Sequence, residues 1–229
     1  MSNLSFLKDI PDPVSPEAAR PEDAGPNRDL PAAPTRSSAR RRRVAALGLS
    51  LAWLFCHLAV FGLRADMRQL PASYVAAQIG LPFLFGASCL AIALAPGRLG
   101  LGIGVGLVSS MALVGPLSYW LLALGMPMPH PLGAQPFGFW LGTLLCLDIT
   151  LSWAAAPLLL VALSLRRAFV AHAVWRSALI GAALGLLSGG AINLHCTNVD
   201  RWHMLAGHGL PVLIAALLGA FLVVRWTRA

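Results

Sequence analysis

The sequence contains few charged residues. Only 11% of its 229 residues are Asp, Glu, Lys or Arg, whereas 57% are hydrophobic, and the mean hydropathy is +0.71. A soluble domain carries about a quarter charged residues, because these cover its surface. The chain has too little polar surface to enclose its apolar residues in water. This excludes an ordinary soluble domain and predicts an integral membrane protein.

Lysine is almost missing, although the chain is basic. Lys and Arg number 17 against 9 Asp and Glu, which gives a formal net charge of +8, and Lys8 is the single lysine. Most arginines border apolar stretches and do not form one continuous face. Basic residues at such borders set membrane orientation, whereas a nucleic-acid site needs a basic patch or stripe. We therefore expect no direct binding of nucleic acid.

Several short motifs are also missing. The four cysteines, Cys56, Cys89, Cys146 and Cys196, include no CxxC pair, which excludes the zinc-finger and thioredoxin patterns. The first 40 residues are polar and do not resemble a secretory signal peptide. Neither a hydrolase triad nor a phosphate-binding loop is apparent. We predict that the protein is not an enzyme.

Six apolar runs dominate the remainder of the chain. Each is close to the roughly 20 residues that an α-helix needs to cross a bilayer. They lie near 44–63, 74–95, 99–124, 138–163, 177–194 and 204–224. The pattern predicts an all-α polytopic membrane protein with six transmembrane helices in a domain over residues 44–229.

The arginines predict the orientation of these helices. If the N-terminus is cytoplasmic, eleven arginines flank the cytoplasmic side: Arg36, Arg40, Arg41, Arg42, Arg43, Arg98, Arg166, Arg167, Arg176, Arg225 and Arg228. The opposite side carries only Arg64, Arg68 and Arg201. Because cytoplasmic loops are enriched in Lys and Arg, both termini are predicted to lie in the cytoplasm.

Residues 1–43 differ in composition from the apolar runs. The stretch from Pro11 to Pro34 is rich in Pro, Ala, Asp and Glu, a composition that cannot bury enough apolar surface to fold alone. We expect a disordered cytoplasmic tail. Its apolar patch, Leu4, Phe6, Leu7 and Ile10, could fold on a partner, and an inert tail is an equal alternative.

Two glycine-rich stretches indicate close helix packing, because small residues let helix backbones approach. One lies in the third run and one in the fifth: Gly97, Gly100, Gly102, Gly104 and Gly106, then Gly181, Gly185, Gly189 and Gly190.

Ionisable side chains inside the apolar runs are few. Asp148 lies in the fourth run and His57 in the first. An intramembrane carboxyl is costly unless it is protonated or hydrogen-bonded, and it often marks a functional site. For Asp148 we favour a buried carboxyl bonded to a neighbouring helix over a switch or a transport site. For His57 we favour a hydrogen bond between helices over a ligand role.

The densest group of metal-binding residue types joins the fifth and sixth runs. His195, Cys196, His203 and His208 lie within fourteen residues, and Cys with His could bind zinc or a similar soft metal ion. In a regular helix His203 and His208 would lie about 140° apart, so they do not form an i, i+4 pair. An interfacial role beside Trp202 is an equal alternative.

The predicted topology adds Cys146 to this region. Cys146 lies one to two turns inside the outer end of the fourth helix, and Cys196 lies at the outer end of the fifth. Two thiols at similar depth could form a reversible disulfide or share a metal ion. Cys56 and Cys89 pair less readily and fit small packing residues.

At these residues the sequence resembles a known family. The resemblance to the NrsF-like (negative regulator of sigma F) membrane anti-sigma factors runs over roughly residues 140–228. It rests on Cys146-Leu147, Ala156-Pro157-Leu158, Leu165-Arg166-Arg167-Ala168, the glycine-rich fifth run, His195-Cys196, His203 and Gly207-His208-Gly209. Thr197 stands where the family most often has Pro, and the tail resembles the family poorly.

The resemblance implies a six-span protein of the bacterial inner membrane. Such proteins hold an extracytoplasmic-function sigma factor until a stress signal arrives. It also implies that Cys146 and Cys196 sense metal or oxidative stress and that the N-terminal segment holds the sigma factor. Two alternatives remain: a haem- or metal-binding redox protein using His57, His195, His203 and His208, and a small transporter using Asp148.

Overall fold

The computed structural model describes residues 36–95, 104–125, 138–165 and 172–227, and these residues form helices and short connections with no strand among them. Within this part of the chain, six helical segments are long and apolar enough to cross a membrane. The all-α prediction with six membrane-length helices is therefore confirmed for the described residues. The orientation of the termini stays a prediction.

The six segments contain eight α-helices and two π-helices. The first three comprise α1 (Arg36–Phe61), the unit of α2 (Ala72–Val75), the π-helix η4 (Ala76–Gly80) and α3 (Leu81–Leu94), and α4 (Val105–Gly125). The last three comprise α5 (Phe139–Leu165), α6 (Ala173–Ile192), and the unit of α7 (Arg201–His203), the π-helix η6 (Met204–Gly209) and α8 (Leu210–Thr227). A short 3-10 helix, η3 (Met67–Gln69), lies between α1 and α2.

The helix boundaries correct two predictions. The first membrane-length span, Arg43–Phe61, agrees with the run predicted near 44–63, but α1 itself begins at Arg36, so the arginine run that was assigned to the tail is helical. The third apolar run was predicted from residue 99, whereas α4 begins at Val105. Arginine has a high helix propensity, so an apolar helix extends readily through a basic flank.

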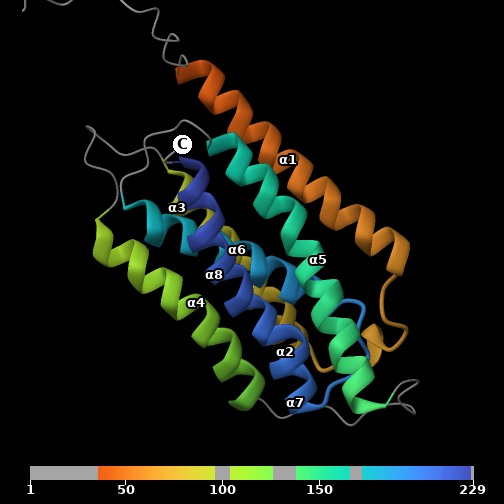
Figure 1. Cartoon of the computed structure of the whole chain (residues 1–229). Coiled ribbons are helices and arrows are strands. Elements are labelled where there is room, and N and C mark those ends of the chain that lie inside the picture. The colour runs from red at the N-terminus through yellow and green to blue at the C-terminus, as the bar shows by residue number, and fades with distance from the viewer. Residues whose placement is uncertain (1–35, 96–103, 126–137, 166–171, 228–229) are drawn as a thin grey trace, which may run out of the picture. The chain divides into compact units, whose positions relative to one another are not determined.

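The helix α6 lies at the centre of the bundle, where α8, α3, α4 and α5 surround it (Figure 1). A Cβ atom added to Gly181 would lie 2.0 Å from the Ala215 carbonyl oxygen, and one added to Gly185 would lie 2.8 Å from the Val212 Cα. Only glycine permits this approach of α6 to α8. The predicted packing role of the fifth run is confirmed.

The glycines of the third run behave differently. An added Cβ at Gly104 or at Gly106 would meet no atom within 4 Å, so the predicted close packing is wrong there. Gly97, Gly100 and Gly102 lie outside the described residues.

The helix α1 lies at the edge of the bundle. It packs mainly on α5 and only slightly on α6. The first residues of α1 and the last residues of α8 lie at the same end of the bundle (Figure 1). The connections from α1 to α2 and from α6 to α7 lie at the opposite end, where the candidate site is found.

Candidate metal and thiol site

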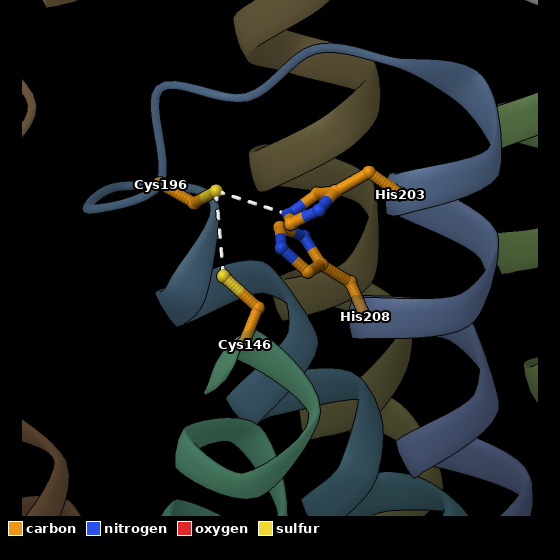
Figure 2. A group of neighbouring side chains, drawn as sticks. All are labelled: Cys146, Cys196, His203 and His208. Atoms are coloured by element: carbon orange, nitrogen blue, oxygen red, sulfur yellow. Dashed lines mark hydrogen bonds between the residues drawn. The ribbon is translucent and has the colours of Figure 1, made fainter. Parts of the chain in front are cut away.

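Four sulfur- and nitrogen-bearing side chains converge at this end of the bundle (Figure 2). They come from three parts of the chain: Cys146 from α5, Cys196 from the segment after α6, and His203 and His208 from the last helical unit. One potential ligand atom from each lies within 4.8 Å of the other three. The Cys146 Sγ lies 3.6 Å from the Cys196 Sγ, which lies 3.3 Å from the His203 Nε2.

A π-helix brings the two histidines together. In η6 the Leu210 N–H bonds to the Leu205 carbonyl, an i→i+5 bond that widens the turn. His203 and His208, five residues apart, therefore face each other with ring centroids 5.1 Å apart. The expectation that they point in different directions assumed a regular α-helix and is wrong. Such π-turns occur frequently at functional sites.

The start of this helical unit is also fixed by a side chain. Asp200 is the N-cap residue, and its Oδ1 accepts hydrogen bonds from the backbone N–H groups of Trp202 and His203 at 2.9 and 3.0 Å. The cap orients the first turn so that Trp202 is exposed while His203 is buried. The interfacial interpretation therefore fits Trp202 but not His203.

His203 is oriented by Thr143 on α5. The Thr143 hydroxyl donates to the Phe139 carbonyl at 2.7 Å and lies 3.1 Å from the His203 Nδ1. Because the hydroxyl proton is used in the first bond, the network assigns the proton of the second bond to Nδ1. That tautomer leaves the Nε2 lone pair directed at Cys196.

His208 is oriented by Asn193 at the end of α6. The His208 Nδ1 lies 2.5 Å from the Asn193 Oδ1, and the Asn193 amide donates to the Gln78 carbonyl at 2.7 Å and to the Tyr119 hydroxyl at 3.1 Å. The amide thus presents its oxygen to Nδ1. The His208 Nε2 is buried and has no hydrogen-bond partner among the described residues.

This donor set fits a soft divalent metal ion. Two thiolates and two imidazoles form a Cys2His2 set, which zinc binds tetrahedrally. The unpartnered His208 Nε2 is the kind of buried atom that a metal ion would satisfy, and both histidines have an outer partner on Nδ1, as metal-binding histidines usually do. Four protein ligands complete a tetrahedral shell, which is the arrangement of structural sites and not of catalytic ones.

The two thiols are also close enough to react with each other. Both are partly buried and neither forms a disulfide in the structure. A hydrogen bond from the Cys146 thiol lowers the pKa of Cys196, and the hydrogen bond to His203 acts in the same direction, against the effect of burial. Cys196 is therefore the better nucleophile of the pair, since the thiolate is the reactive form.

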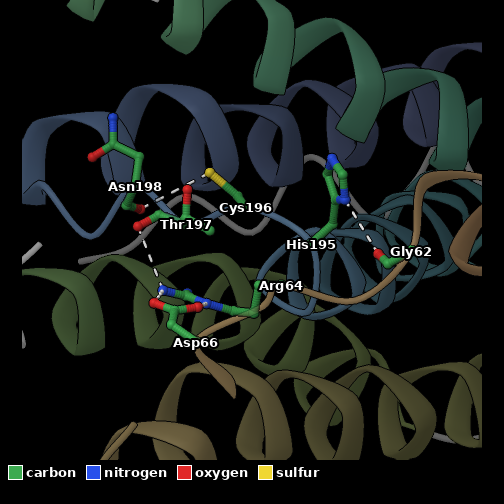
Figure 3. A network of polar contacts seen from close by, with 7 residues as sticks. All are labelled: Gly62, Arg64, Asp66, His195, Cys196, Thr197 and Asn198. Atoms are coloured by element: carbon green, nitrogen blue, oxygen red, sulfur yellow. Dashed lines mark hydrogen bonds and ion pairs between the residues drawn. The ribbon is translucent and has the colours of Figure 1, made fainter. Parts of the chain in front are cut away.

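The segment that carries Cys196 is bonded to the connection after α1 (Figure 3). The Arg64 backbone N–H donates to the Leu194 carbonyl at 2.8 Å, and its guanidinium donates to the Thr197 carbonyl at 3.4 Å. The same guanidinium forms a bidentate pair with Asp66 at 2.6 and 2.7 Å. This hydrogen bond from Arg64 lowers the pKa of Asp66.

His195 belongs to this second network and not to the cluster. Its Nδ1 lies 3.2 Å from the Gly62 carbonyl, and its ring packs edge-on against Phe61. The predicted set of metal-binding residues is therefore corrected for His195, whereas Cys146, which was predicted to share a metal ion or a disulfide with Cys196, lies in the cluster. Contiguity in the sequence was misleading here, because the adjacent side chains of His195 and Cys196 bond to different parts of the chain.

The two polar residues predicted inside the membrane differ from expectation. Asp148 is exposed on the outside of α5 and has no hydrogen-bond partner among the described residues, so the favoured buried carboxyl is wrong. His57 bonds through Nδ1 to the Trp53 carbonyl of its own helix at 2.9 Å and packs edge-on against Trp153. The expected bond between helices is replaced by one within α1, and His57 faces no other histidine, as a haem pair would require.

Cys56 is exposed on α1, and Cys89 is buried in the core on α3. The apolar patch of Leu4, Phe6, Leu7 and Ile10 lies outside the described residues.

Sequence reasoning missed the residues that orient the cluster. Thr143 lies one turn before Cys146, and Asn193 directly follows the glycine-rich helix. Either could have been suspected as a polar residue beside a candidate ligand. Arg64 gave no such signal, because the carbonyls of Leu194 and Thr197 that it bonds are about 130 residues away in the chain.

One comparison with known proteins found a protein family that matches this chain. The family model described as "NrsF: Negative regulator of sigma F" matches residues 27–228. No match to the chain was found among curated proteins or among solved structures.

Proposed function

Because the chain belongs to the family of negative regulators of sigma F, we propose that it is a membrane-embedded anti-sigma factor that binds an extracytoplasmic-function sigma factor. The family match and the six membrane-length helices support this role. A regulator of this kind binds a partner and catalyses no reaction. Its location is proposed to be the bacterial inner membrane, with both termini in the cytoplasm as the arginine distribution predicts.

The proposed contact with the sigma factor lies in the N-terminal tail. Leu4, Phe6, Leu7 and Ile10 form its apolar patch, and a short segment of this composition can fold on a partner surface. In the predicted topology the tail lies on the same side of the membrane as a soluble sigma factor. The tail precedes α1 directly, so a movement of α1 would reach it.

The proposed sensor is the cluster of Cys146, Cys196, His203 and His208. The observation that carries this proposal is the convergence of four ligand atoms within 4.8 Å, together with the unpartnered His208 Nε2. A zinc-like or other soft metal ion would join α5, the segment after α6 and the last helical unit. Oxidation would instead join the two thiols in one S–S bond. The thiols would release two protons and pass two electrons to the oxidant that causes the stress.

The proposed signal path runs through the loop contacts. Oxidation would shift Cys196, because a disulfide of about 2.05 Å is much shorter than the present 3.6 Å between the sulfurs. A tetrahedral metal ion with metal–sulfur bonds of about 2.3 Å would hold the two sulfurs about 3.8 Å apart, so it would instead fix the segment near its present position. Leu194 and Thr197 are bonded to Arg64, three residues beyond the end of α1. A shift of this segment would move α1. The bundle would then have two arrangements, and the chemical state of the cluster would favour one of them.

The experiment compares four single variants in a strain with a sigma-dependent reporter. Cys146→Ser and Cys196→Ser are expected to keep basal repression and to lose release by metal or oxidant. Cys56→Ser and Cys89→Ser are the matched controls, because neither thiol lies in the cluster. Purified wild-type protein is expected to bind one zinc ion, and both cluster variants are expected to bind it more weakly.

Two outcomes would separate the parts of the proposal. Failure of the wild-type protein to co-purify with any sigma factor would contradict the anti-sigma role. Normal release in both cluster variants would contradict only the sensing role. Thr143→Val gives a finer test, because loss of an outer partner of a metal-binding histidine typically weakens binding by about 10–100-fold.

A further inference from the structure

Two arginines converge at the end of the bundle that carries the start of α1. The Arg43 Nη1 donates to the Leu94 carbonyl at 3.3 Å, and the Arg176 Nη2 donates to the Ala95 carbonyl at 2.9 Å. The two guanidinium groups therefore lie on adjacent carbonyls at the end of α3. Two positive charges on adjacent carbonyls repel one another, and an anion between them would relieve that repulsion.

A buried hydroxyl lies beside the two arginines. A cleft of about 20 Å³ is lined by Arg43, Arg176 and Ser177 together with apolar residues of α3, α5 and α6. Ser177 is 1% exposed, and its Oγ has no hydrogen-bond partner among the described residues. A space of this size holds about one water-sized atom. It can therefore admit a single oxygen of a larger anion.

The part of the chain that the structure describes supplies no counter-charge here. Its acidic residues are Asp66, Asp148 and Asp200. Asp66 and Asp200 lie at the opposite end, in the connections after α1 and α6, and Asp148 lies in the half of α5 near that end. Within the described residues the only ion pair is that between Arg64 and Asp66.

An apolar groove lies beside the arginine cleft. The groove has a volume of about 280 Å³, lies between α1 and α3 with α6 beneath, and shares Leu94 with the cleft. Its lining is almost entirely apolar and includes Leu47, Leu51, Leu90, Leu94, Leu184 and Leu187. Because α1 packs mainly on α5, the side between α1 and α3 is left open.

We propose that this cleft and groove bind one anionic phospholipid. Its phosphate would lie on Arg43 and Arg176 with one oxygen toward the Ser177 hydroxyl, and an acyl chain would fill the groove between α1 and α3. Arg43 begins the first membrane span and Arg176 lies in the first turn of the fifth, which places both guanidiniums at headgroup depth. Basic pockets between transmembrane helices are a recurrent mode of headgroup binding.

A lipid fits these observations better than an acidic protein segment. The groove has an almost entirely apolar lining, which suits an acyl chain and not an acidic peptide. The cleft admits one oxygen, which suits a phosphate held at its mouth. A bound lipid would fasten α1 to α3 and α6, the side on which the protein itself provides few contacts.

The test uses the full-length protein in detergent, with thermal unfolding and native mass spectrometry as readouts. Dioleoyl phosphatidylglycerol is expected to raise the unfolding temperature and to leave one retained lipid, whereas dioleoyl phosphatidylcholine is expected to do neither. Inorganic phosphate alone is expected to have a much smaller effect, because it cannot occupy the groove. Equal effects of the two lipids, or of phosphate and phosphatidylglycerol, would overturn the proposal.

Variants distinguish the two parts of the site. Arg43→Gln and Arg176→Gln are each expected to weaken phosphatidylglycerol binding by about fivefold, with exposed Arg225→Gln as the matched control. Ala91→Phe would fill the groove and is expected to abolish lipid retention while leaving both arginines in place. Unchanged binding in these three variants would contradict the site.

Ser177→Ala tests whether the Ser177 hydroxyl binds the lipid or only stabilises the fold. Removal of an unpartnered buried hydroxyl is expected to leave lipid-free stability unchanged or raised, while the stabilisation by phosphatidylglycerol becomes smaller. Lower stability without lipid and an unchanged lipid effect would overturn the assignment of Ser177. Loss of sigma-factor binding in the arginine variants with lipid retention unchanged would instead make the cleft a protein-binding site and would also overturn the proposal.

Discussion

The helices α6 and α1 are both long enough to cross a membrane, but they are held in opposite ways. In α6, 83% of the span is buried inside the bundle, whereas in α1 only 17% is buried. Glycines bring the backbone of α6 against α8, while α1 rests mainly on α5 and on the loop bonds of Arg64. This contrast suits the proposed relay, in which α1 would shift while α6 stays in place.

The largest expected effect comes from removing the close approach at α6. Gly181→Ala places a methyl group 2.0 Å from a backbone oxygen of α8, so the two helices must separate. Overpacking typically costs 1–3 kcal/mol, and a backbone contact cannot be relieved by a rotamer change, so we expect about 3 kcal/mol or more. Thermal unfolding in detergent measures it.

Gly106→Ala on α4 is the matched control, because an added Cβ there meets no atom within 4 Å. We expect no loss of stability in this variant. Equal destabilisation by both substitutions would contradict the conclusion that Gly181 matters because of its contact with α8.

The next effect concerns the link between α6 and α1. Arg64→Gln removes the charge-assisted bonds to Asp66 and Thr197, and bonds to charged groups contribute about 1.5–3 kcal/mol. We expect the 194–198 segment to loosen. Hydrogen exchange of this segment and maleimide labelling of Cys196 should become faster. Unchanged labelling would show that the link does not hold the segment.

The ion pair of Arg64 and Asp66 predicts that the stability of the protein depends on pH. Arg64 lowers the pKa of Asp66, so the unfolded chain takes up this proton more readily than the folded chain. The contribution is complete above the unfolded pKa of about 3.9 and is lost as the pH falls through the lowered pKa of the folded state. The measurement is the free energy of unfolding from pH 6 to pH 3. The decrease in stability that comes from protonation of Asp66 should be missing in Asp66→Asn. A wild-type curve identical to that of the variant would contradict it.

The smallest expected effect lies on the outer face of α1. Val60 is 80% exposed, so Val60→Ala should change stability by no more than about 0.5 kcal/mol. Leu184→Ala on α6, where the side chain is 2% exposed, should cost about 2–5 kcal/mol. Urea or thermal unfolding of the two variants compares the peripheral and the central helix directly.

Much of the fold was predictable because hydropathy and small-residue spacing are local properties. The six apolar runs correspond to the six membrane-length segments, and the spacing of Gly181 and Gly185 marks a real helix contact. The same spacing signal was wrong for Gly104 and Gly106. A glycine pattern states that close approach is permitted, and only a partner helix makes it occur.

The candidate site was predictable only in part. Cys146 and Cys196 were expected at similar depth, and the structure places their sulfurs 3.6 Å apart. The pairing of His203 with His208 could not be derived, because it depends on a π-turn that a regular helical period does not predict. Asp148 was expected inside and lies outside, since the side of α5 that faces its neighbours is set by packing.

The sequence by itself determined that the chain is a basic, arginine-flanked bundle of six apolar helices with thiol and imidazole groups near one end. Composition and hydropathy suffice for this, because transfer from water to lipid is a sum over residues. Only the tertiary structure decided that His195 lies outside the cluster while Cys146 lies in it, that Thr143 and Asn193 orient the two histidines of the cluster, and that Arg43 and Arg176 lie beside one cleft at the other end of the bundle. These choices depend on contacts between distant segments, and no local pattern encodes a partner.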